Sequence, residues 1–162
     1  MIELGDKKEA ITAEELPYII SDVLKTPHEK SFKLKLCNIV TCSGLKPTAV
    51  VQLLYRDGIA DKELLLEESA QGDGGYDAFM NAIRKIAKKI NYSLPTLLDY
   101  VVIIPPGGKT DALVQCTITW SNQYNKTFVT KGVNPDQVLA AVEATEKMLN
   151  VIAFQKKEQL TQ

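Results

Sequence analysis

Three stretches rich in apolar residues stand in the first half of the chain, and the first of them begins with alternating apolar and polar residues. Residues 32–40, 48–55 and 62–70 have the spacing of β-strands, and the breaks between them contain Gly or Pro. Over residues 77–90 the period changes, and apolar side chains recur every three or four positions on one helical face. The first half therefore predicts three strands followed by a helix.

The second half repeats this order. Three further strands are expected over residues 98–104, 112–120 and 125–130, and a long helix is expected from residue 136 to about residue 156. Each half is thus a β-β-β-α unit, over about residues 31–90 and 97–156. The expected fold class is α+β, because the open face of each small sheet needs a helix and the other unit to bury it.

Short sequence matches between the halves support a duplication. The segment Lys46–Gln52 returns as Lys109–Gln115, with its Lys, Ala, Val and Gln at the same places. Asp77 and Ala82 return as Asp136 and Ala141, at a slightly shorter spacing that a shorter loop would explain. A repeat of this length predicts two copies of one supersecondary unit, related by a pseudo-two-fold axis.

Residues 1–27 have a different pattern from the rest of the chain. Thr12 and Glu15 fit a capping box, and apolar residues then recur at helical spacing up to Leu24. Pro17 makes the start of this helix irregular. We expect a helical linker over residues 1–27 and one domain over residues 28–162.

Charge and hydropathy exclude several classes of partner. The net charge is −1, from 19 basic and 20 acidic residues, so no nucleic-acid partner is expected. The basic cluster Arg84-Lys85-Lys88-Lys89 is expected to form the solvated face of a helix. No apolar run is long enough to span a membrane, and no signal segment is present at Met1. These features predict a cytoplasmic location and no membrane partner.

The chain lacks the residue groups that metal sites and nucleophilic catalysis require. Cys37, Cys42 and Cys116 form no Cys-x-x-Cys pair and are expected to be reduced, buried thiols. The only histidine, His28, follows a proline and is expected in a surface loop. We therefore expect no metal, no cofactor and no catalytic residue.

The stretch Gly72-Asp73-Gly74-Gly75 before the first helix is the main candidate for a site. Glycines there permit positive φ and expose backbone N–H groups, which favour an anion at a helix start. A flexible strand-to-helix turn explains the pattern equally well. Asp73 and Asp77 are possible acceptors for an ammonium group, so a zwitterion fits better than a phosphate. The recurrence of Asp77 as Asp136 favours an N-cap role for both.

Five segments in this order resemble the C-terminal regulatory domain of 2-isopropylmalate synthases and citramalate synthases. They are SGLKPTAVVQLLYRDG, SAQGDGGYDAFMNAIRKI, LLDYVVII, KTDALVQCTITW and TKGVNPDQVLAAVEATEKMLNVI. The likeness covers about residues 30–153. GDKKEAITAEELPYIISDVL is also similar to the helical linker that precedes this domain in the family.

The resemblance implies a homodimeric regulatory domain that binds a pathway end product, leucine or isoleucine, near the dimer interface. Full-length members condense acetyl-CoA with a 2-oxo acid on a metal-dependent barrel of roughly 250 residues, which this chain is too short to contain. By position, the effector site would take Gly72, Asp73, Gly74, Gly75, Tyr76 and Asp77 from the loop and helix start, Leu97, Tyr100 and Ile104 from the next strand, and Val133 from the turn at residues 132–135.

Two residues depart from the pattern of the family. Gly75 stands where the family often has Pro, and Tyr76 stands where a smaller apolar residue is common. A tyrosine there could fill the space meant for the effector. The alternative hypothesis is therefore a structural dimerisation module that has no ligand.

Overall fold

The computed structural model describes residues 30–104 and 112–161. The predicted linker helix within residues 1–27 and His28 lie outside the described residues.

The first unit consists of a three-stranded antiparallel sheet and a helix. Its elements are β1 (Phe32–Val40), β2 (Thr48–Asp57), β3 (Lys62–Gln71) and α3 (Gly75–Lys89). The strand order is β1-β2-β3, so each strand pairs with its neighbour in sequence. The predicted strands are confirmed, and the helix begins slightly earlier than expected, at Gly75.

The second unit has the same topology. Its elements are β4 (Thr96–Ile103), β5 (Val114–Ser121), β6 (Thr127–Asn134) and α4 (Gln137–Leu160), and its strand order is β4-β5-β6. The α+β class and the two β-β-β-α units are confirmed. Strand β6 runs past its predicted end, so Gly132, Val133 and Asn134 lie in a strand and not in a turn.

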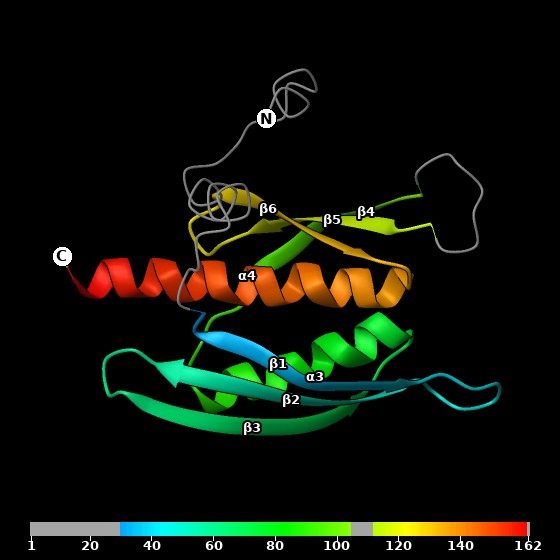
Figure 1. Ribbon diagram of the computed structural model, residues 1–162, viewed down its shortest axis with the longest axis horizontal. Helices are drawn as coiled ribbons and strands as arrows, with labels where there is room; N and C mark the ends of the chain where they lie inside the picture. Colours follow the sequence, from blue (N-terminus) through cyan, green and yellow to red (C-terminus); the bar gives the residue numbers. More distant parts are fainter. Residues whose placement is uncertain (1–29, 105–111, 162) are drawn as a thin grey trace, which may run out of the picture.

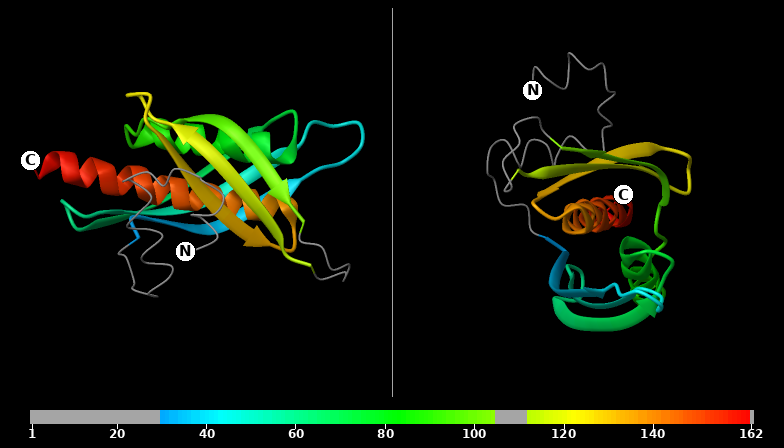
Figure 2. Two further views of the ribbon diagram at one scale, coloured as in Figure 1. Left: turned by 90° about the horizontal axis from the view of Figure 1, so that it is seen from above. Right: turned by 90° about the vertical axis from the view of Figure 1, so that its right-hand side faces the viewer.

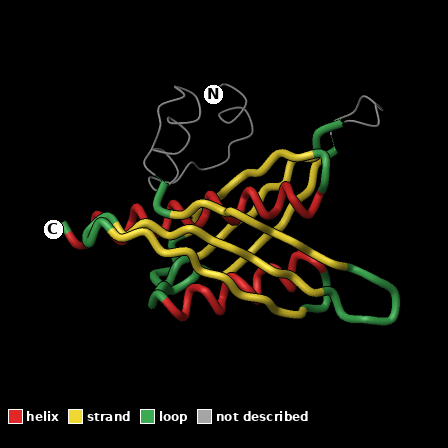
Figure 3. Tube along the Cα trace, turned by 60° about the horizontal axis from the view of Figure 1, so that its bottom comes forward, coloured by secondary structure: helices red, strands yellow, loops and turns green. Residues whose placement is uncertain are grey.

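The two sheets enclose the two helices (Figures 1 and 2). The β1-β2-β3 sheet and the β4-β5-β6 sheet lie on opposite sides, and α4 runs between them with α3 beside it. Strands of the two sheets run in different directions (Figure 3). Helix α3 packs on β2 and β3, whereas α4 packs on β5 and β6 and also reaches β1. The second unit therefore supplies part of the core of the first.

The burial of the two helices reflects these positions. Helix α3 buries one face, and Arg84, Lys85, Lys88 and Lys89 on its other side are exposed, which confirms the predicted solvated face. Helix α4 is buried on several sides between residues 140 and 153 because it has a sheet above it and a strand below it.

One buried side chain of α4 joins the two units directly. The Asn150 carboxamide accepts a hydrogen bond from the Phe32 backbone N–H at 2.9 Å and donates one to the Phe32 carbonyl at 3.0 Å. Phe32 begins β1, and its ring is fully buried against Tyr55 and Tyr92. Asn150 thus satisfies backbone groups of a strand that is far away in the sequence.

A β-bulge at the same place in each unit fixes how the two copies correspond. The extra residue is Lys35 in β1 and Leu98 in β4. The residue that follows the bulge pairs with Gln52 of β2 in the first unit and with Thr119 of β5 in the second unit. Gln52 and Thr119 are further apart in the sequence than Lys35 and Leu98 are, so the hairpin between the first two strands is longer in the second unit.

The third strands and the helices correspond at another spacing. Helix α3 has Gly74 as its N-cap residue, and α4 has Asp136. On the third strands, Glu67 pairs with Gln52, and Val129 pairs with Thr119. The number of residues from Glu67 to Val129 equals the number from Gly74 to Asp136. The repeat is confirmed, but three predicted equivalences are wrong within the described residues: the match of Ala49–Gln52 with Ala112–Gln115, and those of Asp77 with Asp136 and Ala82 with Ala141. The rest of the first match, up to residue 111, lies outside the described residues.

Cysteine burial differs at one position from the expectation. Cys116 is buried and Cys37 is half-buried, but Cys42 is exposed because it follows the end of β1 in a loop. All three thiols are free. Burial raises the pKa of the Cys37 thiol to about 11, which keeps it protonated at neutral pH.

Candidate functional site

The glycine-rich loop leads directly from β3 into α3. The Gly72 N–H donates to the Pro47 carbonyl at 3.1 Å, and a Cβ atom at Gly72 would lie 2.3 Å from the Ala78 backbone nitrogen. Among the described glycines, only Gly44 has a positive φ. The loop glycines therefore do not use the positive φ that glycine permits, and Gly72 is needed because the helix start lies so close.

The first turn of α3 has no side-chain cap. Its N-cap residue is Gly74, and Asp77 stands at the third helical position, where its Oδ2 accepts from the Asp73 N–H at 2.9 Å. The predicted N-cap role of Asp77 is therefore wrong. It is right for Asp136, whose carboxylate accepts from the Val138 and Leu139 N–H groups.

This difference leaves backbone donors available in one unit only. The N–H groups at the start of a helix have no intrahelical acceptor, and they carry the positive end of the helix dipole. In α4 the Asp136 carboxylate occupies two of them, whereas no described side chain caps α3. The α3 start is therefore the better place for an external carboxylate.

Both signs of charge surround the α3 start. The Asp73 carboxylate is nearly fully exposed and lies 3.9 Å from the Lys46 ammonium group. Asp77 adds a second carboxylate within the first turn. These groups suit the ammonium end of a zwitterion, while the backbone N–H groups suit its carboxylate end.

Tyr76 connects the two helices. Its hydroxyl lies 2.7 Å from the Thr145 Oγ1 of α4. Thr145 already donates its proton to the Ala141 carbonyl at 2.8 Å, so the Tyr76 hydroxyl is the donor in the contact between the two side chains. Burial raises the pKa of Tyr76 well above its ordinary value, so this donor stays protonated.

Tyr100 of β4 packs against Tyr76. The centroids of the two rings are 5.6 Å apart. The Tyr100 hydroxyl lies near the Cys116 and Gln137 side chains, and burial raises the pKa of Tyr100 to about 12. Two of the predicted effector residues, one from each unit, thus meet on the seam between the units.

A groove of about 650 Å³ lies along α3 beside this pair. Tyr76, Asp77 and Leu97 line one part of it, and Arg84 and Lys88 of the next two helical turns line another. Because the Tyr76 hydroxyl is bound to Thr145, its ring forms a wall of the groove and leaves the groove open.

Ile104 and Val133 are not brought to this groove within one chain. Ile104 follows the end of β4 and is 67 % exposed. Val133 pairs with Gln115 on β6 and is 46 % exposed, on the opposite face of the sheet from the buried Cys116 and Ile118. The β3–α3 turn, the β6–α4 turn and the end of β4 nevertheless lie toward one end of the molecule (Figures 1 and 2).

Sequence reasoning missed several residues near the groove. Thr145 is hydrogen-bonded to Tyr76, Gln137 lies near Tyr100, and Arg84 and Lys88 were assigned only to a solvated face. The one available signal was a threonine on a helix face otherwise made of Ala, Val and Met. Nothing in the sequence indicated that this face meets Tyr76.

The described residues contain neither a candidate metal site nor a candidate membrane-spanning helix. Within residues 30–104 and 112–161, no group of three or more His, Cys, Asp or Glu side chains is placed to hold a metal ion. In the same ranges, no helix is long and apolar enough to cross a membrane.

The fold defines a class of α+β domain made of two β-β-β-α units that share one core. A family profile described as the LeuA allosteric (dimerisation) domain matches residues 10–153. The chain belongs to this family.

Full-length relatives carry two enzyme names. The chain is 33 % identical over 155 residues to a protein of Methanosphaerula palustris named as an (R)-citramalate synthase, CimA, with 96 % of this chain and 29 % of that protein covered. It is 34 % identical over 155 residues to the 2-isopropylmalate synthase of Aliarcobacter butzleri, with 95 % and 28 % covered. The chain thus spans less than a third of the length of these curated relatives.

Proposed function

We propose that this chain is the feedback-regulatory domain of a 2-isopropylmalate synthase, that it binds leucine, and that it forms a homodimer. The family and the named relatives support a regulatory and dimerising role. The catalytic barrel would belong to the full-length transferase. The alternative enzyme is a citramalate synthase regulated by isoleucine, because relatives with that name are equally similar.

The uncapped start of α3 beside an open groove is the observation that carries this proposal. The backbone N–H groups after Gly74 have no side-chain cap among the described residues, and the groove begins at Tyr76 and Asp77. A carboxylate bound to these N–H groups is stabilised by hydrogen bonds and by the helix dipole. The equivalent donors of α4 are occupied by Asp136.

The same site offers partners for the rest of a branched-chain amino acid. The Asp73 and Asp77 carboxylates would attract its ammonium group. Leu97 is 36 % exposed in the groove and, with the Tyr76 ring, provides an apolar wall for the branched side chain. Leucine therefore has a complementary group for each of its three parts. Ile104 and Val133 would join the site only through the second chain of the dimer.

Regulation requires that the ligand favours one of two arrangements. A ligand shifts an equilibrium only through its different affinity for the two states. The contacts between Tyr76 and Thr145 and between Tyr76 and Tyr100 join the units next to the proposed site. Leucine against Tyr76 would bias the packing of α3 on α4, and the dimer and linker would transmit that change.

Thermal unfolding with and without amino acids tests the proposal. At 100 times the dissociation constant, leucine is expected to stabilise the folded chain by about 2.7 kcal/mol. Serine placed at residue 74 would cap the N–H groups that the carboxylate needs, so Gly74→Ser is expected to weaken leucine binding about tenfold. The fold should tolerate it, because a Cβ atom at Gly74 has no neighbour within 4 Å.

Asp136→Ser is the matched control, because it exchanges one cap for another on α4 and should leave leucine binding unchanged. Equal stabilisation of the parent chain and Gly74→Ser would remove the helix start from the site. The absence of any shift at millimolar leucine and isoleucine would contradict the effector role.

A second candidate function is a structural dimerisation module without a ligand. The observation in its favour is the Tyr76 side chain, which fills part of the seam and is bound to Thr145. Both functions predict a dimer in sedimentation experiments. Only the regulatory function predicts an amino-acid-dependent shift in stability.

A further inference from the structure

The outer strands of the two sheets differ in how their free backbone edges are covered. They are β1, β3, β4 and β6, and such an edge presents N–H and C=O groups to which another chain can pair. Asn150 bonds to the beginning of β1, as described above. The Lys85 Nζ atom donates to the Ser69 carbonyl of β3 at 2.8 Å, and the Glu143 carboxylate accepts from the Val133 N–H of β6 at 3.2 Å. Part of each of these three edges is therefore occupied.

The pairing of the second sheet shows which backbone groups of β4 face outward. Val133 turns its N–H away from β5, so its partner Gln115 directs its own backbone groups toward β4. There Gln115 pairs with Ile103, which is consequently hydrogen-bonded to β5. Because these directions alternate along a strand, Val102 and Tyr100 point their N–H and C=O groups to the open edge.

Strand β4 lacks the features that protect an edge. It contains no Lys and no Pro, and its one charged residue is Asp99. Among the described residues, no side chain hydrogen-bonds to the outward backbone groups of residues 100 and 102. Beyond Asp99, three aliphatic side chains are exposed: Val101 by 42 %, Ile103 by 43 % and Ile104 by 67 %. An apolar edge of this kind is a template for strand addition.

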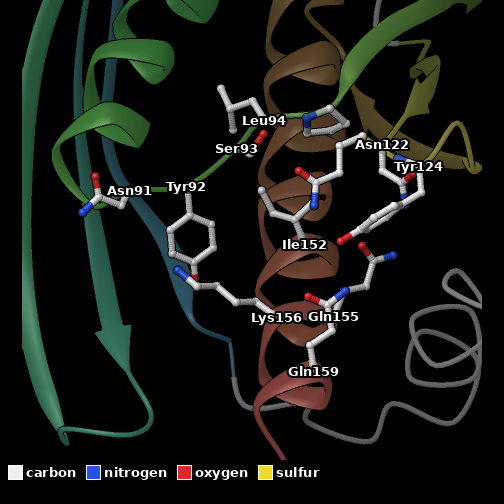
Figure 4. A pocket seen from close by; sticks show the side chains of 12 residues that line it. Asn91, Tyr92, Ser93, Leu94, Asn122, Tyr124, Ile152, Gln155, Lys156 and Gln159 are labelled. Atoms are coloured by element: carbon white, nitrogen blue, oxygen red, sulfur yellow. Dashed lines mark hydrogen bonds between the residues drawn. The ribbon is translucent and has the colours of Figure 1, made fainter. Parts of the chain in front are cut away.

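The chain enters β4 through a segment that is firmly held. The Tyr92 N–H donates to the Ala87 carbonyl at 2.9 Å, and the Tyr92 hydroxyl lies 3.4 Å from that of Tyr55. The Lys156 ammonium group lies 4.0 Å from the centroid of the Tyr92 ring (Figure 4). Pro95, just before the strand, is buried. A strand that is already fixed loses little conformational freedom when another strand pairs with it.

The partner that fits this edge is a second copy of the same strand. The matching family profile describes a dimerisation domain, and antiparallel pairing of two identical strands has the two-fold symmetry of a closed dimer. With Val102 on the axis, Val101 faces Ile103 of the partner subunit and Tyr100 faces Ile104 of the partner subunit. Every pair is then aliphatic or aromatic. An axis at Val101 would place the Asp99 carboxylate opposite an isoleucine.

We infer that two copies of this chain join by antiparallel pairing of β4 over residues 100–104, with Val102 on the two-fold axis. This inference rests on the homodimer of the proposed function and names its interface. The outward backbone groups of Tyr100 and Val102 gain hydrogen-bond partners, and the exposed aliphatic side chains become buried. Pairing also supplies Ile104 of the partner subunit to the neighbourhood of Tyr100, which one chain alone does not do.

Amide hydrogen exchange tests the backbone pairing. The folded chain is compared at concentrations above and below the dimer dissociation constant, which sedimentation provides. Exchange at Tyr100 and Val102 should be slower in the dimer by about tenfold or more, whereas Ile103, bonded to β5, should be protected in both states. A dimer in which Tyr100 and Val102 exchange as fast as in the monomer would overturn the inference and leave the homodimer standing.

NMR of dimers mixed from labelled and unlabelled chains tests the register. The Hα atom of Val101 should show a contact with the Hα atom of Ile103 of the partner subunit, because residues directly opposite in such a pair have the closest Cα atoms. Within one chain these two residues are too far apart for this signal. Its absence from a dimeric sample would overturn the register.

Two variants test the side chains. Val101→Lys and Ile103→Lys each place a charge at the interface twice per dimer, so each is expected to weaken dimerisation about a hundredfold. Leu65→Lys is the matched control, because Leu65 is 59 % exposed on the outer strand β3, and it should dimerise like the parent chain. Thermal unfolding verifies that all three variants fold.

The outcomes separate the interface from the proposed function. Unchanged dimerisation in both Val101→Lys and Ile103→Lys would overturn the interface alone. A parent chain that stays monomeric at millimolar concentration would overturn the homodimer of the proposed function and the interface with it.

Discussion

Single glycines in this chain serve different physical purposes, and the structure separates them. Gly72 and Gly132 are required by contact, because a Cβ atom at either would overlap backbone atoms of the following helix. Gly74 is free of such contacts and matters through the side chain it lacks. The sequence marked residues 72–75 as one loop and could not distinguish these roles, because close approach depends on where the helix packs.

Gly132→Ala is expected to destabilise the chain by about 3 kcal/mol, near the upper end for overpacking. Its Cβ atom would lie 1.9 Å from the Ala140 carbonyl oxygen and 2.8 Å from the Ala144 nitrogen, so β6 would have to move away from α4. Urea denaturation measures the change. Gly74→Ala is the control, with a smaller change of about 0.5–1 kcal/mol because Ala is a poorer N-cap residue than Gly, and equal effects of the two variants would contradict the prediction.

Tyr76→Phe is expected to lower the free energy of unfolding by about 1 kcal/mol, the typical contribution of one hydrogen bond. It removes the bond that the Tyr76 hydroxyl donates to Thr145, while the ring contacts with Tyr100 and Phe79 remain. Urea denaturation again provides the measurement. Tyr124→Phe changes an exposed tyrosine of a turn and should be neutral. A neutral Tyr76→Phe would show that the bond contributes nothing to stability.

At the scale of elements, the hydrophobic pattern was sufficient for the strands and helices but not for their register. Short runs rich in apolar residues, bounded by turn residues, identified all six strands, and alternation was regular in only some of them. The match between Lys46–Gln52 and Lys109–Gln115 implied a certain offset in residue number between the two copies. The strand pairing makes Gln52 equivalent to Thr119, which is a larger offset. Turn lengths changed between the copies, and only pairing across the sheet reveals that change.

The same limit explains the misassigned cap. Both helices carry an aspartate near their start, but Asp136 precedes α4 and Asp77 is inside α3. A capping residue is defined by the backbone conformation at the helix start, and Gly74 has that conformation in the first unit. The glycine pattern led to this helix start as the candidate site, whereas the partners Thr145 and Gln137 come from a distant helix.

Contact between α4 and β1 gives a prediction at this scale. Asn150→Leu is expected to destabilise the chain by about 2–3 kcal/mol, because the Phe32 N–H and carbonyl would be buried without partners. Amide hydrogen exchange at Phe32 should accelerate more than exchange in β5. Asn38→Ala, at an exposed site on β1, is the control and should change stability by at most about 0.5 kcal/mol. Unchanged exchange at Phe32 would contradict the role of Asn150.

For the whole molecule, the central position of α4 makes the two units one folding unit. The sequence predicted two copies and the class of fold because periodicity reports which faces are buried. The sequence did not predict that α4 would contact both sheets. Apolar residues on several sides of a helix indicate that it is buried, but they do not identify the elements that cover it. The arrangement places three tyrosines with raised pKa values, Tyr76, Tyr92 and Tyr100, at or near the seam.

Alkaline pH should therefore weaken the fold. The pKa of Tyr100 is about 12 in the folded chain against an ordinary 10, and that of Cys37 is about 11 against 9. The folded chain retains protons that the unfolded chain loses, so this contribution to stability is complete below pH 9 and declines as the pH rises toward 12. Urea midpoints measured at several pH values between 8 and 12 should fall, and less steeply in Tyr100→Phe between pH 10 and 12. A midpoint that stays constant to pH 11.5 would contradict the expected linkage.

The Asn150 carboxamide presents an N–H group and a carbonyl to β1 in the way that a peptide group of a fourth strand would. Phe32 therefore cannot pair there with a strand from another chain. Along the described parts of the other outer strands, β3, β4 and β6, no carboxamide satisfies both backbone groups of one residue in this way, and β4 carries exposed Leu98, Val101 and Ile103. If copies of this chain join by strand addition, or aggregate when isolated, the first contact is expected at those open edges and not at the beginning of β1.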